Sequence, residues 1–440
     1  FTREQRFING VKRHPGRIRM KTGMDGNGVL LAHAVEAVLD TGAYTVFGNV
    51  VLEITTECCA GPYRIPNISM DTYAVYTNNG SNGAFRGFGA AQGCFAVEGQ
   101  INALARASGI DAIDLRLKNC LLQGERSAMG HQLLADTCMR ETLQAASRDS
   151  LWRERAERRG EKAGVLSGVG VACGMKGYSI GINDAPDYGF AQAAITRAGD
   201  VKLTVGCNEL GQGAFTVMGV MLAETMRIPY GSVGYLGLSD TDLNEETGAT
   251  ASSRITYAVG RAVETAGREL ILALRDVGAK AYGVKPDELE HVDGGFRCRG
   301  RFIPFSEIAD KSEIDISRRV RVRTAYSETK DEGGLGHPHV LYSSNVQIAC
   351  VQIDSATGMA YADEMRVYVD VGRCMDVAAV EGQSEGGVVM GISYALLERI
   401  DRKDGRPLNT SFSTYMIPTT KDTPKVIQNH ILEIPEPTHP

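Results

Sequence analysis

Apolar and polar positions in the first third of the chain follow the patterns of both strands and helices. Residues 29–35 and 71–76 have the character of strands. After Gly93, apolar side chains recur at helical spacing and predict an amphipathic helix. Asp111 then has the position of an N-cap, and the helix that it begins is expected to run to Cys120. This part of the chain therefore mixes strands and helices.

A charged stretch, residues 148–162, separates this part from a second mixed region. We expect the stretch to be a solvated helix or a linker between two domains. Beyond it, residues 201–205 alternate as in a strand and lead into a helix at about 214–227. A long helix is predicted at about 259–278, and residues 347–370 have the pattern of a β-hairpin.

The size and charge of the chain limit the number of domains and the kinds of partner that we expect. Its 440 residues suffice for two or three domains with a substantial core. The net charge of −6 argues against nucleic acid or an anionic membrane as the main partner. No run of about eighteen apolar residues occurs, which argues against a bilayer-spanning helix. We therefore expect a cytoplasmic protein that acts on a small molecule.

Neither end of the sequence resembles a natural terminus. The chain begins at Phe1 without methionine or a signal sequence, and it stops abruptly at Pro440. We expect it to be an interior part of a longer polypeptide.

Cysteine and histidine spacing gives no strong metal signal. The ten cysteines are scattered singly apart from Cys58-Cys59, without a C-x-x-C motif, which indicates neither a structural zinc nor an iron–sulfur cluster. For His337-Pro338-His339 we favour a turn before a strand over a metal site.

Four segments combine small residues, a side-chain donor and an expected helix N-terminus. Glycine lets backbone amides approach a bound group closely, and the amides at a helix N-terminus favour negative charge. Singly, such a segment is more often a helix cap, but four together predict a large polar ligand with many acceptors, such as a pterin with phosphates. The segments are Arg86–Gln92, Leu210–Gly213, Ala249–Ser253 and Gly382–Glu385.

A dinucleotide fold is the first alternative for the Arg86 segment. Gly87, Gly89 and Gly93 approximate the G-x-G-x-x-G fingerprint and precede a predicted helix. However, the third glycine is one position late, and Arg86 and Phe88 have no role in that fingerprint. We therefore disfavour this interpretation.

Six motifs, in order, resemble the molybdenum-binding region of the xanthine dehydrogenase / aldehyde oxidoreductase family of molybdenum hydroxylases. Each is weak alone, but together they span essentially the whole chain. They are Ala84-Phe85-Arg86-Gly87-Phe88-Gly89 with Gln92-Gly93, Glu209-Leu210-Gly211-Gln212-Gly213, Thr250-Ala251-Ser252-Ser253, Asp370-Val371-Gly372, Gly382-Gln383-Ser384-Glu385-Gly386 and Ser413-Thr414-Tyr415-Met416-Ile417-Pro418.

The resemblance implies an α+β fold in which helices flank mixed sheets. It implies a first molybdopterin-binding domain at residues 1–122, a linker with helices at 123–165 and a second molybdopterin-binding domain at 166–440. By the same resemblance, Phe88 faces the substrate ring and no side chain ligates molybdenum, although Arg86 and Ala251 lie beside it. The residues expected at the cofactor are Arg86, Gly87, Gly211, Gln212, Thr250, Ala251, Ser252, Ser253 and Gln383.

Departures from the family pattern bear on the catalytic site. The family's catalytic glutamate is expected beyond Pro440, so this chain holds no catalytic residue itself, and the family's upstream Gly-Gly-Phe-Gly loop is expected before Phe1. Ile54 stands where purine-oxidising members have a substrate-binding arginine, which weakens a xanthine assignment. The family's carbon monoxide branch has a cysteine-bearing loop in place of Gly87-Phe88, which disfavours that chemistry.

The function that the resemblance implies is hydroxylation of an electron-poor carbon in a purine- or nicotinate-like N-heteroaromatic, with oxygen derived from water. The cofactor is a molybdenum pterin, expected as a dinucleotide, and electrons pass to iron–sulfur centres on a partner subunit or domain, with FAD on another. A companion chain or segment supplies the glutamate, so the assembly is a hetero-oligomer. The alternatives are an aldehyde oxidoreductase of the same family, a non-catalytic assembly subunit and, last, a nicotinamide-dependent dehydrogenase.

Overall fold

The computed structural model shows a chain that folds into two compact units. The first unit comprises Phe1–Gly177 and Lys330–Glu436, and the second is formed mainly by Tyr178–Thr329. The residues that the structure describes are 1–130, 132–133, 137–178, 187–237, 240–323, 339 and 341–434. Within these residues, no helix combines the length and apolar character that crossing a membrane requires.

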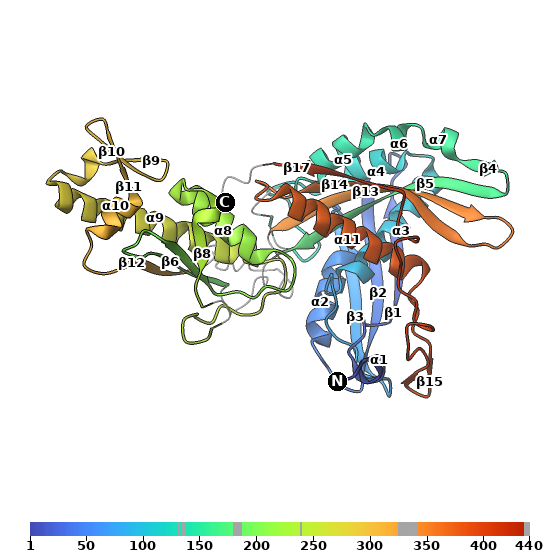
Figure 1. Ribbon diagram of the computed structural model, residues 1–440. Coiled ribbons are helices and arrows are strands. Elements are labelled where there is room, and N and C mark those ends of the chain that lie inside the picture. Colours follow the sequence, from blue (N-terminus) through green and yellow to red (C-terminus); the bar gives the residue numbers. More distant parts are fainter. Residues whose placement is uncertain are drawn as a thin grey trace. The chain divides into compact units, whose positions relative to one another are not determined.

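The N-terminal part of the first unit is built on a three-stranded sheet, drawn in blue in Figure 1. Its elements are α1 (Arg3–Asn9), β1 (Gly16–Met24), β2 (Leu30–Gly42), α2 (Gly48–Cys59), β3 (Asn67–Tyr76), α3 (Ala90–Ser108) and α4 (Ala112–Asn119). β1 pairs antiparallel with β2, and β2 pairs parallel with β3 through the crossover helix α2. Helices α2 and α3 pack on each other. The strands and helices predicted here are confirmed, including the Asp111 cap, which accepts from the amide of Ile113 at 2.8 Å.

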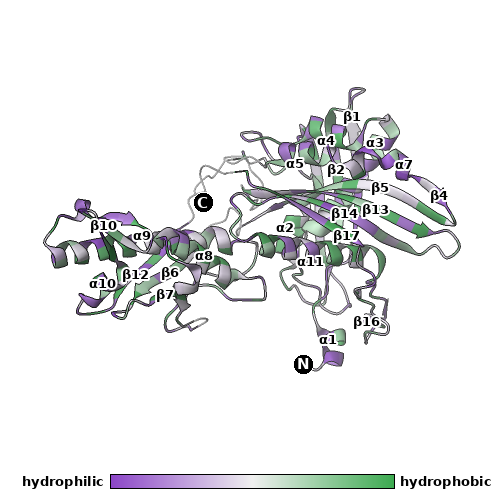
Figure 2. Cartoon of the chain, turned by 45° about the horizontal axis from the view of Figure 1, so that its top comes forward, coloured by the Kyte–Doolittle hydropathy of each residue, from purple (hydrophilic) through white to green (hydrophobic). Residues whose placement is uncertain are grey.

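A five-stranded sheet forms the other half of the first unit. Its strands, in spatial order, are β17 (Val426–Leu432), β14 (Ala360–Asp370), β13 (Tyr342–Asp354), β5 (Val165–Gly177) and β4 (Gly160–Lys162). The predicted hairpin is confirmed as the antiparallel pair β13–β14. In Figure 2 these strands carry both green apolar and purple polar residues, as expected for a sheet whose strands alternate between a packed and a more accessible side.

Helices cover both faces of this sheet (Figure 1). They are α5 (Met139–Ser147), α6 (Ser150–Arg153) and α7 (Arg155–Arg158) on one face and α11 (Val377–Leu396) on the other. The charged stretch at 148–162 therefore forms α6, α7 and β4 within the first unit instead of a free linker. The reason is that Leu151 and Trp152 are buried in the same core cluster as residues of β5 and β13. A small hairpin, β15 (Arg402–Lys403) with β16 (Arg406–Pro407), follows α11.

The second unit contains a four-stranded sheet in the order β12-β6-β7-β8, covered by two helices, and a small three-stranded sheet. Its strands are β6 (Tyr188–Ile195), β7 (Val201–Val205), β8 (Val233–Tyr235), β9 (Glu290–Val292), β10 (Gly295–Cys298), β11 (Arg301–Pro304) and β12 (Ile316–Arg323), and its helices are α8 (Ala214–Met226), α9 (Ile255–Tyr282) and α10 (Phe305–Asp310). The predicted helices confirmed as α8 and α9 begin directly after the loops expected at the cofactor.

Two buried carboxylates tie distant parts of the first unit together. Glu98 of α3 accepts from Arg116 Nη2 at 2.7 Å and from the amide of Cys173 in β5 at 2.6 Å, which joins the two sheets. Glu57 of α2 accepts from His339 Nδ1 at 2.9 Å and from the Tyr342 hydroxyl at 2.5 Å. Although burial opposes it, the contact with His339 helps to keep the pKa of Glu57 below its ordinary value. Helices α2 and α3, which carry the first candidate site, are thereby fixed.

Mixed sheets flanked by helices confirm the α+β fold class. The predicted division into residues 1–122, 123–165 and 166–440 concerns cofactor-binding domains, a different criterion from compactness, and stays a prediction. His339 is a buried partner of Glu57, whereas His337 and Pro338 lie outside the described residues. No group of three metal-ligating side chains occurs in the described part of the chain.

Candidate functional site

The Arg86 loop of the first unit ends in a run of left-handed backbone. Gly87, Phe88 and Gly89 have φ values of 87°, 47° and 101°. The turn is closed by Phe88 N donating to Phe85 O at 2.7 Å and by Ala90 N donating to Gly87 O at 2.9 Å. A phenylalanine in this conformation is strained, and such strain is concentrated at functional sites. These three residues reverse the direction of the backbone directly before α3 begins.

Two of the loop's glycines serve packing instead of a ligand. A Cβ on Gly89 would lie 2.3 Å from Val51 O, and a Cβ on Gly93 would lie 2.7 Å from Thr55 O. Both carbonyls belong to α2, so the glycines permit the start of α3 to approach that helix. Close approach of a ligand remains possible only at Gly87, whose Cβ would meet Ala91 alone, at 3.6 Å.

Arg86 and Phe88 lie on the accessible side of the loop. The Arg86 side chain is exposed and has no hydrogen bond or ion pair with any residue that the structure describes. Phe88 is half-buried, and beneath it Ile54 of α2 is 7% exposed in an apolar cluster with Cys58 and Ala90. The structure therefore brings Arg86, Phe88 and Ile54 together, with Ile54 as the floor under the Phe88 ring.

Sequence reasoning missed two residues around this loop. Phe47 precedes α2 with a φ of 57°, is 60% exposed, and places its ring centroid 6.2 Å from that of Phe88. Arg13 donates from Nη2 to Arg86 O at 2.8 Å. Neither belongs to a glycine-rich motif, so the sequence offered only an arginine and an aromatic residue in unremarkable surroundings.

The Gln212 loop of the second unit is capped by its own carboxylate. Glu209 accepts from the amides of Gly211, Gly213 and Phe215 at 2.8, 2.9 and 3.2 Å. Desolvation raises the pKa of Glu209, but these hydrogen bonds outweigh it and hold the pKa below its ordinary value. The expectation that this loop presents free amides to a ligand is wrong for these three groups, because the N-terminus of α8 is already occupied by Glu209.

The Gln212 side chain forms hydrogen bonds within the same loop, while Gly211 stays uncrowded. Leu210 N donates to Gln212 Oε1 at 2.6 Å, and Gln212 Nε2 donates to Asn208 O at 3.2 Å. Asn208 N in turn donates to Thr250 Oγ1 at 2.9 Å, which joins this loop to the serine loop. The structure therefore joins the Gln212 loop to Thr250 through Asn208, and the predicted binding roles of Gly211, Gln212 and Thr250 stay predictions.

The serine loop is strained and exposed. Ser252 and Ser253 have φ values of 56° and 52°, and both side chains and Ala251 are exposed. Behind them Arg254 is 1% exposed, donates from Nε to Asp187 Oδ1 at 2.6 Å and from Nη1 to Ala249 O at 3.3 Å. Sequence reasoning missed Arg254, which ties the loop to Asp187, the residue directly before β6.

Gln383 does not lie in a loop before a helix. Helix α11 begins at Val377, where the Asp376 side chain accepts from the amide of Ala379 at 3.0 Å. Gln383 therefore occupies the helix interior, exposed to its surroundings, and the prediction of a loop at Gly382–Glu385 is wrong. The glycines that suggested a loop are accommodated because α11 is held by packing on β14 and β17.

The exposed groups at these positions are mainly hydrogen-bond donors. The first unit offers the Arg86 guanidinium and an uncrowded Gly87, and the second offers the hydroxyls of Ser252 and Ser253. Gly211 is also uncrowded, but its amide already donates to Glu209. A donor set of this kind suits a ligand rich in phosphate and oxo acceptors. The residues present therefore fit a phosphorylated, oxo-bearing cofactor.

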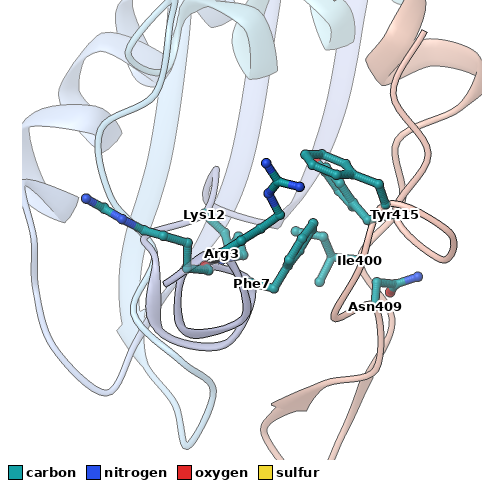
Figure 3. Close-up of a pocket in the computed structure, with 8 residues that line it drawn as sticks. Arg3, Phe7, Lys12, Ile400, Asn409 and Tyr415 are labelled. Atoms are coloured by element: carbon teal, nitrogen blue, oxygen red, sulfur yellow. Dashed lines mark hydrogen bonds between the residues drawn. The ribbon is translucent and has the colours of Figure 1, made fainter. Parts of the chain in front are cut away.

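The cavities of the first unit are separate from most of these residues. One, of about 240 Å³, lies between the N-terminal segment and residues 400–415, and Figure 3 shows Phe7 and Lys12 facing Ile400, Asn409 and Tyr415 across it. None of the predicted site residues lines this cavity.

All ten cysteines are free thiols, and eight of them are buried. Burial raises the pKa of Cys59, beside the first site, to about 12. A thiol with such a pKa stays protonated at neutral pH and is a poor nucleophile.

Comparisons with known proteins agree with the geometry. The molybdopterin cofactor-binding domain family matches residues 1–120 and 144–424. A probable xanthine dehydrogenase subunit of Bacillus subtilis is 29% identical over 426 residues, which cover 96% of this chain and 56% of that protein. The "Nicotinate dehydrogenase large molybdopterin subunit" of Eubacterium barkeri is 44% identical over 145 residues, 33% of this chain and 34% of that protein.

Among solved structures, quinoline 2-oxidoreductase of Pseudomonas putida 86 superposes with a TM-score of 0.84 at 22% identity. The match covers all of this chain and 58% of that one. This likeness shows the fold. The chain spans little more than half the length of the Bacillus relative and of this structure.

Proposed function

Because this chain belongs to the molybdopterin-binding family of xanthine dehydrogenases and aldehyde oxidoreductases, we propose that it is the cofactor-holding part of a molybdenum hydroxylase. The observation that carries the proposal is the pair of exposed donor loops, one in each unit, at the positions where the family motifs occur. The cofactor expected there supplies transfer of water-derived oxygen to an electron-poor carbon and accepts two electrons.

The residues of this chain bind and orient. In the first unit, Arg86 and Gly87 would hold oxo or phosphate groups through a charged and a neutral donor. In the second unit, the hydroxyls of the Thr250–Ser253 segment would donate to such groups, and the uncrowded Gly211 would let them approach the backbone closely. Gln212 contributes by bracing its loop, since its amide is engaged within the loop. Gln383, which is exposed on α11, would contact the pterin.

The substrate is proposed to be a nicotinate-like heteroaromatic. Phe88 offers an accessible ring, supported from below by Ile54, and aromatic stacking adds about 0.5–1.5 kcal/mol beyond burial. An apolar Ile54 offers no charge to recognise the polar edge of xanthine. The Eubacterium relative, whose name states nicotinate as its substrate, gives this choice further support.

Electrons must leave the site through other chains or segments. The ten cysteines of this chain are scattered free thiols, so we propose that iron–sulfur centres lie on a partner, with FAD beyond them. The general base is proposed to be a glutamate of a companion segment. The pterin is proposed to carry a dinucleotide, whose phosphates suit the donor loops.

The proposal is tested by supplying nicotinate to the purified complex in water enriched in ¹⁸O. We expect a hydroxylated nicotinate that carries one ¹⁸O atom, detected by mass spectrometry. Oxidation of benzaldehyde without any nicotinate product would favour an aldehyde oxidoreductase. If neither compound is oxidised by a complex that contains molybdenum, the proposed substrate class is wrong.

A further inference from the structure

We propose that Arg13 is a positioning residue that fixes the peptide between Arg86 and Gly87 in its cofactor-binding orientation. This inference rests on the proposed function of the Arg86 loop. Arg13 Nη2 donates to Arg86 O at 2.8 Å. In a planar trans peptide the carbonyl and the following N–H point in opposite directions. Holding the Arg86 carbonyl toward Arg13 therefore aims the Gly87 N–H away from Arg13.

Gly87 needs such a constraint more than another residue would. Its φ is 87°, and glycine adopts positive and negative φ values at similar cost. Its surroundings are also open, so packing does not fix its conformation. Without a tether on the Arg86 carbonyl, the peptide can rotate and redirect the Gly87 N–H. The Arg13 hydrogen bond selects one of these orientations.

Arg13 is itself in contact with two aromatic rings. Its guanidinium carbon lies 4.8 Å from the centroid of Phe85 and 4.6 Å from that of Tyr394. The two rings are 5.8 Å apart at an interplanar angle of 82°. A planar guanidinium can contact both rings and still donate to a carbonyl, which a lysine ammonium does less well.

These contacts connect two elements that are proposed to touch the cofactor. Tyr394 lies on α11, the helix that carries Gln383, and Phe85 lies in the Arg86 loop. Arg13 therefore links the loop to α11 within the first unit. A displacement of either element would be transmitted to the other through the guanidinium.

The residues on either side of Arg13 accept hydrogen bonds from residues that flank the Arg86 loop. Lys12 O accepts from Gly83 N at 2.8 Å, and His14 O accepts from Gln92 Nε2 at 3.4 Å. His14 is buried, with only 2% of its surface exposed. Arg13 thus projects from a fixed support between the two ends of the loop.

The test compares Arg13→Ala and Arg13→Lys with the control Arg19→Lys, each in the complete complex with its companion chains. Arg19 lies on β1, is 63% exposed and pairs with Glu36 at 3.4 Å. We measure hydrogen–deuterium exchange at residues 86–89, the Mo(V) EPR spectrum after dithionite reduction, and turnover of nicotinate. Neither exchange nor EPR requires the substrate to be known.

For both Arg13 variants we expect faster exchange at residues 86–89 and a shifted EPR signal, which the Arg19 variant does not show. We also expect kcat to fall by about ten- to a hundredfold with little change in KM, because misplacement of a binding group acts on the transition state. Arg13→Lys, which keeps the charge, decides the matter if Arg13→Ala fails to fold. Exchange and EPR equal to those of Arg19→Lys would overturn the proposal.

Failure of the proposed function has a different signature. A wild-type complex without molybdenum gives no EPR signal, but the exchange comparison still decides whether Arg13 fixes the loop. Faster exchange with an unchanged EPR spectrum in a molybdenum-loaded complex would show that the loop peptide does not bear on the metal, and would overturn the positioning role.

Discussion

In the first unit the Arg86 loop is held by close steric contact, whereas in the second unit the loops at Gln212 and Ser252 are held by charged groups. Gly89 and Gly93 leave no room for a Cβ against α2. By contrast, Glu209 caps α8 and the buried Arg254 pairs with Asp187. The two sets of loops are thus supported by different physical means, and each set should lose its structure under different substitutions.

The largest effect is expected at the buried ion pair of the second unit. Arg254→Met removes the Arg254 guanidinium from the buried Asp187 carboxylate, of which 4% is exposed, and it should lower the free energy of unfolding by about 3–5 kcal/mol. Urea unfolding of the purified chain measures this. Arg268→Met, in the helix α9 that Arg254 precedes, is the control; Arg268 is 70% exposed, and its loss should cost less than about 0.5 kcal/mol. Equal losses would show that the serine loop does not depend on Arg254.

The steric support of the first unit is tested by Gly89→Ala. The new Cβ would lie 2.3 Å from Val51 O, and alanine resists a φ of 101°, so we expect a loss of about 2–4 kcal/mol. Gly99→Ala on the same helix meets nothing within 4 Å and should gain about 0.5–1 kcal/mol. Thermal unfolding of both variants gives the comparison. A neutral Gly89→Ala would contradict steric support.

Phe88→Ala tests the accessible ring of the Arg86 loop apart from the glycines that pack on α2. Loss of ring stacking worth about 0.5–1.5 kcal/mol should raise the KM for nicotinate by roughly two- to tenfold. Molybdenum content, measured by elemental analysis, should not change. Loss of molybdenum would instead mean that Phe88 is structural.

The smallest effect is expected at the charged cap of the second unit. Glu209→Gln should cost about 0.5–1 kcal/mol at pH 7, because the exposed carboxylate is replaced by a weaker acceptor. The pKa of Glu209 lies below its ordinary value of 4.5, so its contribution is complete above that pH. It is lost as the pH falls through the lowered pKa. A difference between wild type and variant that grows toward acid pH would contradict the assignment.

Local sequence signals predicted the elements whose causes are local. The Asp111 cap set the start of α4, and alternation with an intervening turn gave the β13–β14 hairpin. The start of α11 at Val377 was missed because four glycines lie within the helix, where packing on the sheet outweighs their weak propensity. Local pattern cannot reveal such a tertiary effect.

The sequence singled out the loop residues of the candidate site, whose binding roles stay predictions, and missed the residues that support these loops. Arg86, Gln212 and Ser252 lie in motifs that are contiguous in sequence. Their supports come from far along the chain: Arg13 lies 73 residues before Arg86, and Asp187 lies 67 residues before Arg254. Sequence separations of this size leave no periodic trace, so only the folded chain shows which residues hold the loops.

The central claim is that this chain holds a molybdenum cofactor. The most direct test is elemental and nucleotide analysis of the purified complex with its partner chains retained. We expect about one molybdenum per chain, a pterin dinucleotide, and iron contributed by a partner. A complex without molybdenum or pterin, after loss during purification has been excluded, would contradict the claim and assign this chain an assembly role.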